Sequence, residues 1–488
     1  MLQYSLNELR IRYERYVSYA QKKFVERKYL KCIRGIYAAS LLQYSIIDLY
    51  SDVRLNRIIK NLSRELFQEE NETESSDTII LYDSFSWDNH GLTQQYLDAL
   101  YYTSKENVVY VYEKGQYTNT NILKFVEEKC MRCICVNGKN EIEKAERIVK
   151  IIKDLKPGKA VFQIGPYSIA PFLAFYSYPK VVKYNINLTD HAFGLGGADF
   201  FNYTIEFRDY GAQVSLEKRG YKRNQINIIP FYPWIDQTPF NGFPEQAKGK
   251  VVIFSGAAYY KIEGGDGVFQ EIVKQLVTQN SDAIILFAGY GNKTKFEDYI
   301  KQNKLENRVI LLGHRTDINE VFKHSDIFLS TFPLFGGLMV QYAAINKIPI
   351  LAYGTPEVES LVCTKKDYHF VFNNVSLMLA EAKKLITDPE YRKSQGSFFG
   401  SLCVNQEDFR EAFRMWFLTP ANHYTGNVTI DYEAFMDICV RRYNEDGIGA
   451  ITDLRLLSKC PSVLSVKMIC NILACVPYYV KRIKQKLK

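Results

Sequence analysis

The sequence has little that would place the chain across a membrane or outside the cell. Its first 16 residues, MLQYSLNELRIRYERY, carry charges throughout and contain no apolar core, so we expect no secretory signal. The most apolar C-terminal stretch, 463–480, is interrupted by Lys467, Asn471 and Pro477 and is shorter than the roughly 20 apolar residues of a spanning helix. Both absences predict a cytoplasmic protein.

A complete set of metal ligands is also missing. The segment CMRCIC, from Cys130 to Cys135, contains one C-x-x-C, but no second C-x-x-C or paired His follows at a spacing that would supply four zinc ligands. We therefore predict no metal site and interpret these cysteines as small buried residues that lead into a strand. The ten Cys of the chain are expected to be reduced thiols.

The net charge of +8 is not spread as in a nucleic-acid-binding protein. The last eight residues, KRIKQKLK, carry five basic side chains, and the first 34 carry nine Lys or Arg against three Glu. Basic ends suit an anionic membrane surface, at roughly 1 kcal/mol per basic residue near the lipid. We expect no nucleic-acid partner, and we predict peripheral attachment to the inner face of a membrane through the C-terminal tail. A buried C-terminal helix is the alternative.

What the sequence does contain is a long alternation of short apolar strands and helices. Residues 1–75 have apolar positions at helical spacing, and strands then alternate with helices from Thr78 onward. The Pro- and Gly-containing segment 232–250 interrupts this alternation before a second series begins. We predict an α/β protein with two doubly wound parallel-sheet domains, at 76–240 and 241–404. Helical extensions are expected at 1–75 and 405–488.

Ligands of open parallel sheets bind beyond the carboxyl ends of the strands, so the loops there are the places to look. Four such loops in the second predicted domain have unusual content: FSGAAYYKIEGGDG, LFAGYGNKTKF, LLGHRTDINEVF and FPLFGGLMVQ. Their candidate residues for binding a nucleotide diphosphate are Gly256, Lys261, Gly289, His314, Arg315, Gly336, Gly337, Leu338 and Gln341.

The physical reason lies in the combination of these loops. A helix that opens at Gly336 and Gly337 presents free amide groups and a dipole that favour an anion, and glycine allows a phosphate to approach the main chain. Lys261 would neutralise a diphosphate as a point charge, while His314 and Arg315 would frame a nucleobase. A lone loop lysine is usually only solvated and a glycine pair often only makes a turn, but together they form a coherent set.

The first predicted domain offers candidates for the sugar or acceptor side. Asp88, His90 and Gly91 lie between its first strand and helix, and Asp190 and His191 follow a later strand, with Glu206 downstream. His191 is the candidate catalytic base, because imidazole titrates near the working pH. The alternative is an ordinary loop histidine.

The order of these motifs resembles the donor-binding domain of GT-B-fold glycosyltransferases, especially bacterial enzymes of family-4 type. The Tyr260-Lys261-Ile262 element and the step from Gly336 to Pro349 are also similar to the O-linked N-acetylglucosamine transferase family. The resemblance implies two Rossmann-like domains facing a cleft. It also implies that the basic residue of the first loop contacts the diphosphate and that the glycine-led helix holds diphosphate and ribose.

Two departures from the family-4 pattern stand out. Ala257 follows Gly256 where these enzymes commonly carry an Arg soon after the glycine. They also carry two glutamates on the final motif, the second of which binds the ribose, and here the matching stretch offers Gln341 and Tyr342. The resemblance still predicts a glycosyltransferase with a nucleotide-diphosphate sugar as co-substrate, no resident cofactor, and a glycan or lipid-linked acceptor in bacterial surface polysaccharide synthesis. The alternatives are a non-catalytic partner subunit and a nucleotide-sugar epimerase of the same fold.

Overall fold

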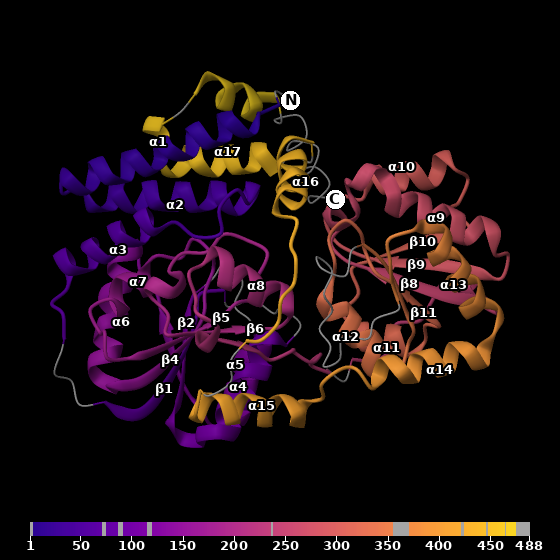
Figure 1. The fold of residues 1–488 in the computed structure, drawn as a ribbon, viewed down its shortest axis with the longest axis horizontal. Coiled ribbons are helices and arrows are strands. Elements are labelled where there is room, and N and C mark those ends of the chain that lie inside the picture. Colours follow the sequence, from indigo (N-terminus) through magenta and orange to yellow (C-terminus); the bar gives the residue numbers. More distant parts are fainter. Residues whose placement is uncertain are drawn as a thin grey trace.

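The structure, a computed structural model, describes residues 3–70, 75–85, 91–114, 120–235, 238–354, 370–420, 424–445, 448–463 and 465–474. Two fully parallel sheets stand side by side, each packed with helices, and a group of helices covers one end of the N-terminal domain (Figure 1). The predicted two-domain α/β fold with helical extensions is confirmed.

The N-terminal sheet has the strand order β3-β2-β1-β4-β5-β6-β7. Its strands are β1 (Ser76–Asp83), β2 (Val108–Glu113), β3 (Arg132–Val136), β4 (Pro157–Gln163), β5 (Val182–Ile186), β6 (Tyr203–Glu206) and β7 (Ile226–Ile228). The helices between them are α4 (Leu92–Ser104), α5 (Thr120–Glu128), α6 (Glu141–Leu155), α7 (Ala170–Phe175) and α8 (Asp209–Lys218).

Both faces of this sheet are buried, as a parallel sheet requires. Ile80 and Tyr82 of β1 belong to one apolar cluster, and Ile79 and Leu81 belong to the cluster on the opposite face. This burial explains why the strands read as continuous apolar runs and not as alternating patterns.

The second sheet has the order β10-β9-β8-β11-β12-β13. Its strands are β8 (Val251–Gly256), β9 (Ala283–Ala288), β10 (Val309–Gly313), β11 (Ile327–Leu329), β12 (Ile350–Tyr353) and β13 (Val371–Phe372). Its helices are α9 (Val268–Gln279), α10 (Thr294–Gln302), α11 (Ile318–Lys323), α12 (Gly337–Ile345), α13 (Val375–Thr387) and α14 (Pro389–Gly400). The strand order reverses between β8 and β11, which makes the loops after these two strands the topological switch point of this domain.

The sequence did not predict two short strands, β6 and β13. β6 has four residues, YTIE, of which two are polar, and β13 has only two residues. Such segments are too short to show a strand period. The segment Cys130–Cys135 does lead into a strand, β3, but the expectation that its cysteines are buried was wrong, since Cys130, Cys133 and Cys135 are exposed. The reason is that β3 is an edge strand, with a neighbour on one side only.

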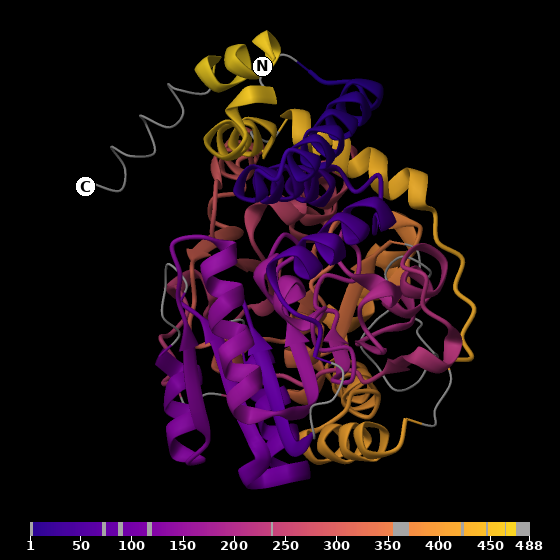
Figure 2. The ribbon, with the colours of Figure 1, turned by 90° about the vertical axis from the view of Figure 1, so that its left-hand side faces the viewer.

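The chain returns to the N-terminal domain after the second sheet. Helix α15 (Gln406–Leu418) packs against α4, where Arg410 donates two hydrogen bonds to Asp98, at 2.6 and 2.8 Å. Helices α16 (Tyr432–Glu445) and α17 (Ile448–Lys459) then pack on α2 (Tyr29–Ile46), beside α1 (Leu6–Val25) and α3 (Val53–Leu66) (Figures 1 and 2). We call these five helices the helical cap.

A buried polar cluster joins the two ends of the chain in the helical cap. Asp453 of α17 accepts hydrogen bonds from Tyr4, Arg12 and Tyr443, and Arg12 and Asp453 form an ion pair. The chain continues into a helix at 466–474, and the basic tail of the membrane prediction lies outside the described residues. In the described part, none of the helices has the length and apolar character needed to cross a membrane.

Candidate functional site

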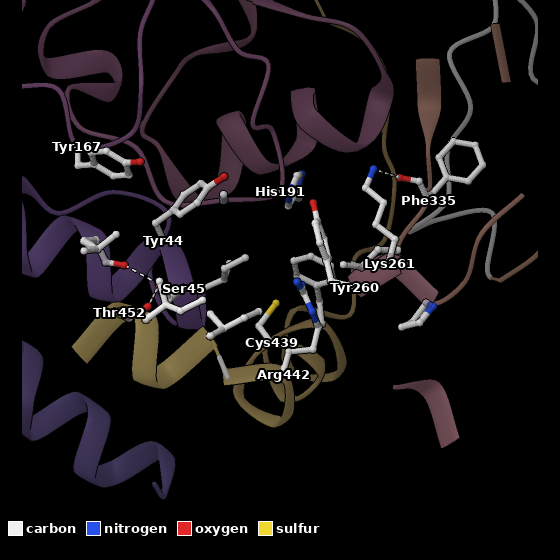
Figure 3. A pocket seen from close by; sticks show the side chains of 18 of the residues that line it. Tyr44, Ser45, Tyr167, His191, Tyr260, Lys261, Phe335, Cys439, Arg442 and Thr452 are labelled. Carbon is white, nitrogen blue, oxygen red and sulfur yellow. Dashed lines mark hydrogen bonds between the residues drawn. The ribbon is translucent and has the colours of Figure 1, made fainter. Parts of the chain in front are cut away.

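A cleft of about 460 Å³ opens where the two sheet domains and the helical cap meet. Its walls come from α2, from the loops after β4, β5 and β6, from the loops after β8 and β11, and from α16 and α17. The cleft therefore lies at the carboxyl ends of the strands, where parallel sheets bind ligands. Figure 3 shows side chains from all three parts of the molecule converging on it.

Lys261 is in this cleft, as the sequence predicted. It lies in a short 3₁₀ segment, Tyr259–Ile262, that follows β8. Its Nζ donates a hydrogen bond of 3.4 Å to the carbonyl oxygen of Phe335, and its own carbonyl accepts one of 3.2 Å from the Leu334 amide. Strands β8 and β11 are neighbours, which brings the Lys261 loop against the segment that leads into α12.

The glycine-led helix is present, but none of the described residues that line the cleft belongs to it. Helix α12 begins at Gly337, and its N-cap residue Gly336 provides no side-chain cap for the first-turn amides. Phe335 lines the cleft, whereas Gly336 is buried. A side chain at Gly336 would meet only Met339, at 3.7 Å, so packing does not demand glycine there. Leu338 is half-buried behind Gly337.

Gln341 lies where no ligand can touch it without rearrangement. Its side chain is fully buried in α12. The neighbouring Tyr342 donates a hydrogen bond of 2.8 Å to the carbonyl of Trp234 in the interdomain linker. At the two positions that match the family's glutamates, Gln341 is thus buried inside the domain and Tyr342 contacts the interdomain linker. The placement of Gln341 gives no support for ribose binding by this residue.

Gly256 and Gly289 are required by close packing at the ends of β8 and β9. A Cβ on Gly289 would lie 2.4 Å from the carbonyl oxygen of Ala257, and one on Gly256 would lie 3.0 Å from that of Ala288. Neither residue lines the cleft described above. They let the two loops run side by side.

The prediction for Arg315 has to be corrected. Its guanidinium forms a buried bidentate ion pair with Asp317, at 2.7 and 2.5 Å, and donates a hydrogen bond of 2.8 Å to the carbonyl of Gly242. The pKa of Asp317 is lowered, first by these hydrogen bonds from Arg315. Arg315 thus holds the interdomain linker and does not frame a nucleobase. His314 is exposed, with its ring edge toward Tyr290 at 6.1 Å.

His191 lines the cleft opposite Lys261, and both side chains project into the same space (Figure 3). Its Nδ1 is 3.1 Å from a carboxylate oxygen of Asp190, and its side chain is 42% exposed. Asp190 is fully buried and also accepts from Arg208 Nε at 2.6 Å. Burial alone would raise the pKa of Asp190, but the charge of Arg208 and the hydrogen bonds from His191 and Arg208 hold it well below its ordinary value.

A carboxylate that stays ionised next to a half-exposed imidazole can hydrogen-bond to one ring nitrogen and so orient the ring. Arg219, which the sequence analysis missed, fixes the loop by donating to the carbonyls of Asp190 and Ala192, both at 2.7 Å. No local motif marks Arg219, because its partners lie almost 30 residues away in the chain.

Glu206 is not on the acceptor side of the cleft, contrary to prediction. It is fully buried at the end of β6 and accepts from Ser215 at 2.6 Å, Thr204 at 2.9 Å and Asn187 at 2.9 and 3.0 Å. Burial raises the pKa of Glu206, opposed by the charge of Arg219. It joins β5, β6 and α8 and does not meet a ligand.

Gly91 begins α4 in a left-handed conformation, with φ of +83°. A Cβ there would lie 1.9 Å from Cβ of Trp234, so glycine lets the interdomain linker pack on the start of the helix. Its role is in packing the linker, and it is not part of the cleft lining. Asp88 and His90 lie outside the described residues. Within the described ranges, His, Cys, Asp and Glu nowhere gather in groups of three or more that could hold a metal ion.

Comparison with known proteins agrees with this geometry. Residues 249–388, which span the second sheet up to α13, match the family model described as glycosyl transferases group 1. No curated protein matches the sequence significantly. Among solved structures, Anabaena HepE (Alr3699) in complex with UDP and glucose is similar, with 12% identity and a TM-score of 0.52, over 70% of this chain and 100% of HepE.

Two other solved structures are more distant. The Thermobaculum terrenum O-GlcNAc transferase has 12% identity and a TM-score of 0.45, over 93% of this chain and 82% of its own. The UDP-GlcNAc 2-epimerase from Neisseria meningitidis has 10% identity and a TM-score of 0.44, over 70% of this chain and 98% of its own.

Two Rossmann-like domains that face a common cleft define the GT-B fold, and the likeness to HepE shows the same fold. Residues 249–388 of the second domain match the model of the glycosyl transferases group 1. The resemblance to GT-B nucleotide-sugar glycosyltransferases that the loop motifs indicated is therefore confirmed.

Proposed function

We propose that this protein is a glycosyltransferase that moves a sugar from a nucleotide-diphosphate donor to a hydroxyl group of an acceptor. The observation that carries the proposal is that Lys261, beside the start of α12, and His191, anchored by Asp190, line one cleft from opposite domains. A cation and a base on facing walls are the two groups that an inverting transfer would use.

The donor side would stabilise the leaving diphosphate electrostatically. The Lys261 ammonium would face the charge that develops as the glycosidic bond breaks, and the positive end of the α12 dipole would lie beside it. The nucleotide sugar is a co-substrate in this scheme, and we expect no resident cofactor. A uridine nucleotide is the first donor to test, because HepE was crystallised with UDP.

The acceptor side would use His191 to remove the proton of the attacking hydroxyl. The buried Asp190 carboxylate hydrogen-bonds to one ring nitrogen of His191, and the other ring nitrogen is left to take the proton of the acceptor hydroxyl. In an inverting reaction this base is essential, whereas in a retaining reaction the leaving phosphate can assist in its place.

The test is a thermal-shift screen of nucleotide diphosphates followed by a transfer assay with the nucleotide that binds. A ligand at a hundred times its Kd should stabilise the folded protein by about 2.7 kcal/mol. Absence of a shift with every nucleotide diphosphate would contradict the proposal.

A non-catalytic partner subunit is a second candidate, favoured by one observation. At the positions of the family's two glutamates, Gln341 is buried and Tyr342 is hydrogen-bonded to the interdomain linker. Nucleotide binding without any turnover would favour this candidate over the transferase.

For location, we propose the cytoplasmic face of a membrane, with a lipid-linked or glycan acceptor of surface polysaccharide synthesis. Val466, Ile469 and Leu473 share one face of the 466–474 helix and are 78%, 43% and 62% exposed. An exposed apolar stripe followed in the sequence by KRIKQKLK has the composition of an interfacial anchor. Flotation with anionic and neutral vesicles tests this, and binding to neither would exclude it.

A further inference from the structure

The helical cap forms one part of the cleft wall, apart from the loops that carry the candidate nucleotide-binding residues. Leu41 and Tyr44 of α2, Phe435 and Arg442 of α16, and Ile451 and Arg455 of α17 line it. These helices are additional to the two sheet domains, and the likeness to HepE extends over 70% of this chain. The cap thus forms one wall of the cleft, and we call the part of the cleft that these six residues line the cap chamber (Figure 3).

The ionic side chains among the described residues that line the cleft are all basic. Its lining contains Arg208, Lys261, Arg442 and Arg455, and no Asp or Glu is among the described residues that form its wall. Asp190 compensates Arg208. In the described part of the chain, no carboxylate forms an ion pair with Arg442 or Arg455, so the cap contributes two guanidinium groups to the cleft without a paired carboxylate.

Arg442 packs on an aromatic ring, and one of its nitrogen atoms lacks a hydrogen-bond partner among the described residues. Its guanidinium carbon lies 4.7 Å from the centroid of the Tyr260 ring, next in sequence to Lys261. Its Nε is buried and, among the described residues, has no hydrogen-bond partner. A buried guanidinium N–H is costly unless a hydrogen-bond acceptor meets it, and an anion is the acceptor that also compensates the charge. The geometry therefore favours an anionic ligand at this end of the cleft.

The remaining wall of the cap chamber is apolar and aromatic. Leu41, Ile47, Phe435, Ile448 and Ile451 come from three helices and surround the two arginines together with tyrosines. Hydrocarbon surface is stabilised by burial against such a wall, whereas hydroxyl groups gain no hydrogen bonds from apolar side chains. The whole cleft volume of about 460 Å³ is within the range of small-ligand sites.

We propose that the cap chamber is the acceptor subsite and that it binds a phosphate or diphosphate group carried by an apolar chain. Arg442 and Arg455 bind the phosphate, and the apolar wall receives the first part of the hydrocarbon. This inference rests on the proposed transferase function, and it specifies the acceptor as a lipid-linked phosphate. The contact between Arg442 and Tyr260 places the acceptor phosphate next to the loop that carries the donor-binding Lys261.

Titration calorimetry with farnesyl diphosphate, below the concentration at which it self-associates, tests the subsite. We expect binding that is at least tenfold tighter than that of inorganic pyrophosphate or farnesol, because each of these lacks one half of the recognised ligand. Arg442→Gln and Arg455→Gln should each weaken the binding of farnesyl diphosphate about tenfold, the effect of one charge-assisted hydrogen bond.

Arg441→Gln is the matched control. Arg441 is the neighbour of Arg442 on α16, but its side chain is 54% exposed and pairs with Asp266 at 3.2 Å. We expect its affinity for farnesyl diphosphate to stay within twofold of the original. Lys261→Met should also retain that affinity, and unchanged circular dichroism and UDP binding in the two arginine variants would verify that they are folded.

Several results would overturn the inference. These are absence of farnesyl diphosphate binding, equal binding of pyrophosphate, equal losses in the Arg441 and Arg442 variants, or loss of binding in Lys261→Met, which would place the ligand in the donor site. UDP titration is a separate measurement. Farnesyl diphosphate binding without any nucleotide binding would contradict the transferase proposal and leave the subsite in place.

Discussion

The Nζ atom of Lys261 lies 3.4 Å from the carbonyl oxygen of Phe335, two residues before α12 begins. This contact joins the loops after β8 and β11, the two strands at which the order of the sheet reverses. A single cation is thereby held beside the positive end of a helix dipole. In the absence of an anion these charges repel, so the pair is arranged for a negatively charged ligand.

The first prediction concerns Lys261 itself. Lys261→Met should weaken UDP binding at least tenfold, because the cation that compensates the diphosphate is lost. Isothermal titration with UDP measures this. Lys248→Met is the control, since Lys248 belongs to the same domain and its side chain is 82% exposed. Equal affinities in the Lys261 variant and the unaltered protein would contradict the donor assignment.

The second prediction separates binding from chemistry at His191. His191→Gln should lower kcat about a hundredfold and leave the donor KM nearly unchanged, because only the proton transfer is lost. The steady-state rate of sugar transfer gives both constants. His324→Gln is the control, because His324 stacks on Phe240 at 3.8 Å in the other domain. A kcat that is unaffected in the His191 variant would remove the base from the mechanism.

A third prediction tests the correction made for Arg315. Arg315→Gln leaves the buried Asp317 carboxylate uncompensated, so the free energy of unfolding should fall by about 3 kcal/mol or more, as measured by urea denaturation. Nucleotide affinity in the folded fraction should stay the same. The double variant Arg315→Met with Asp317→Leu should recover most of the stability, because no charge is then buried. Weakened nucleotide binding with unchanged stability would restore the original assignment.

The fourth prediction compares two glycines with similar backbone angles. Gly91 and Gly242 have φ of +83° and +73°, but a Cβ on Gly91 would meet Trp234 at 1.9 Å, whereas one on Gly242 has nothing within 4 Å. Gly242→Ala should cost only the backbone strain, about 1–2 kcal/mol. Gly91→Ala should cost about 1–3 kcal/mol more, because the linker is displaced. Equal losses of unfolding free energy would mean that Trp234 moves without cost.

The fifth prediction concerns pH. Burial raises the pKa of Glu206 above its ordinary value of 4.5, so the folded protein binds the proton more tightly than the unfolded chain does. The stability that this proton contributes is complete below pH 4.5 and is lost as the pH rises through the folded pKa. The Glu206→Gln variant lacks this titration. Its unfolding free energy, subtracted from that of the unaltered protein, should leave a difference that declines with rising pH, and an increase would show that the pKa is lowered.

The strand and helix alternation could be read from the sequence, because apolar runs buried on both sheet faces are a local signal. The nucleotide loops could be located for the same reason, since each follows a recognisable strand. Lys261 and His191 were found this way, and both line the cleft. The short strand β6 could not be found, because four residues with a mixed composition show no period.

The sequence by itself determined which chemical groups end up at the carboxyl edges of the two sheets, because strand ends and loops are set by neighbours along the chain. Only the tertiary structure decided which of those groups face a ligand. Arg315 and Glu206 form buried hydrogen bonds with other residues and do not reach the cleft. Arg442 and Arg455 lie at the cleft because α16 and α17 pack on α2. These outcomes depend on which polar side chains the tertiary packing buries, and the local pattern of residues does not indicate that.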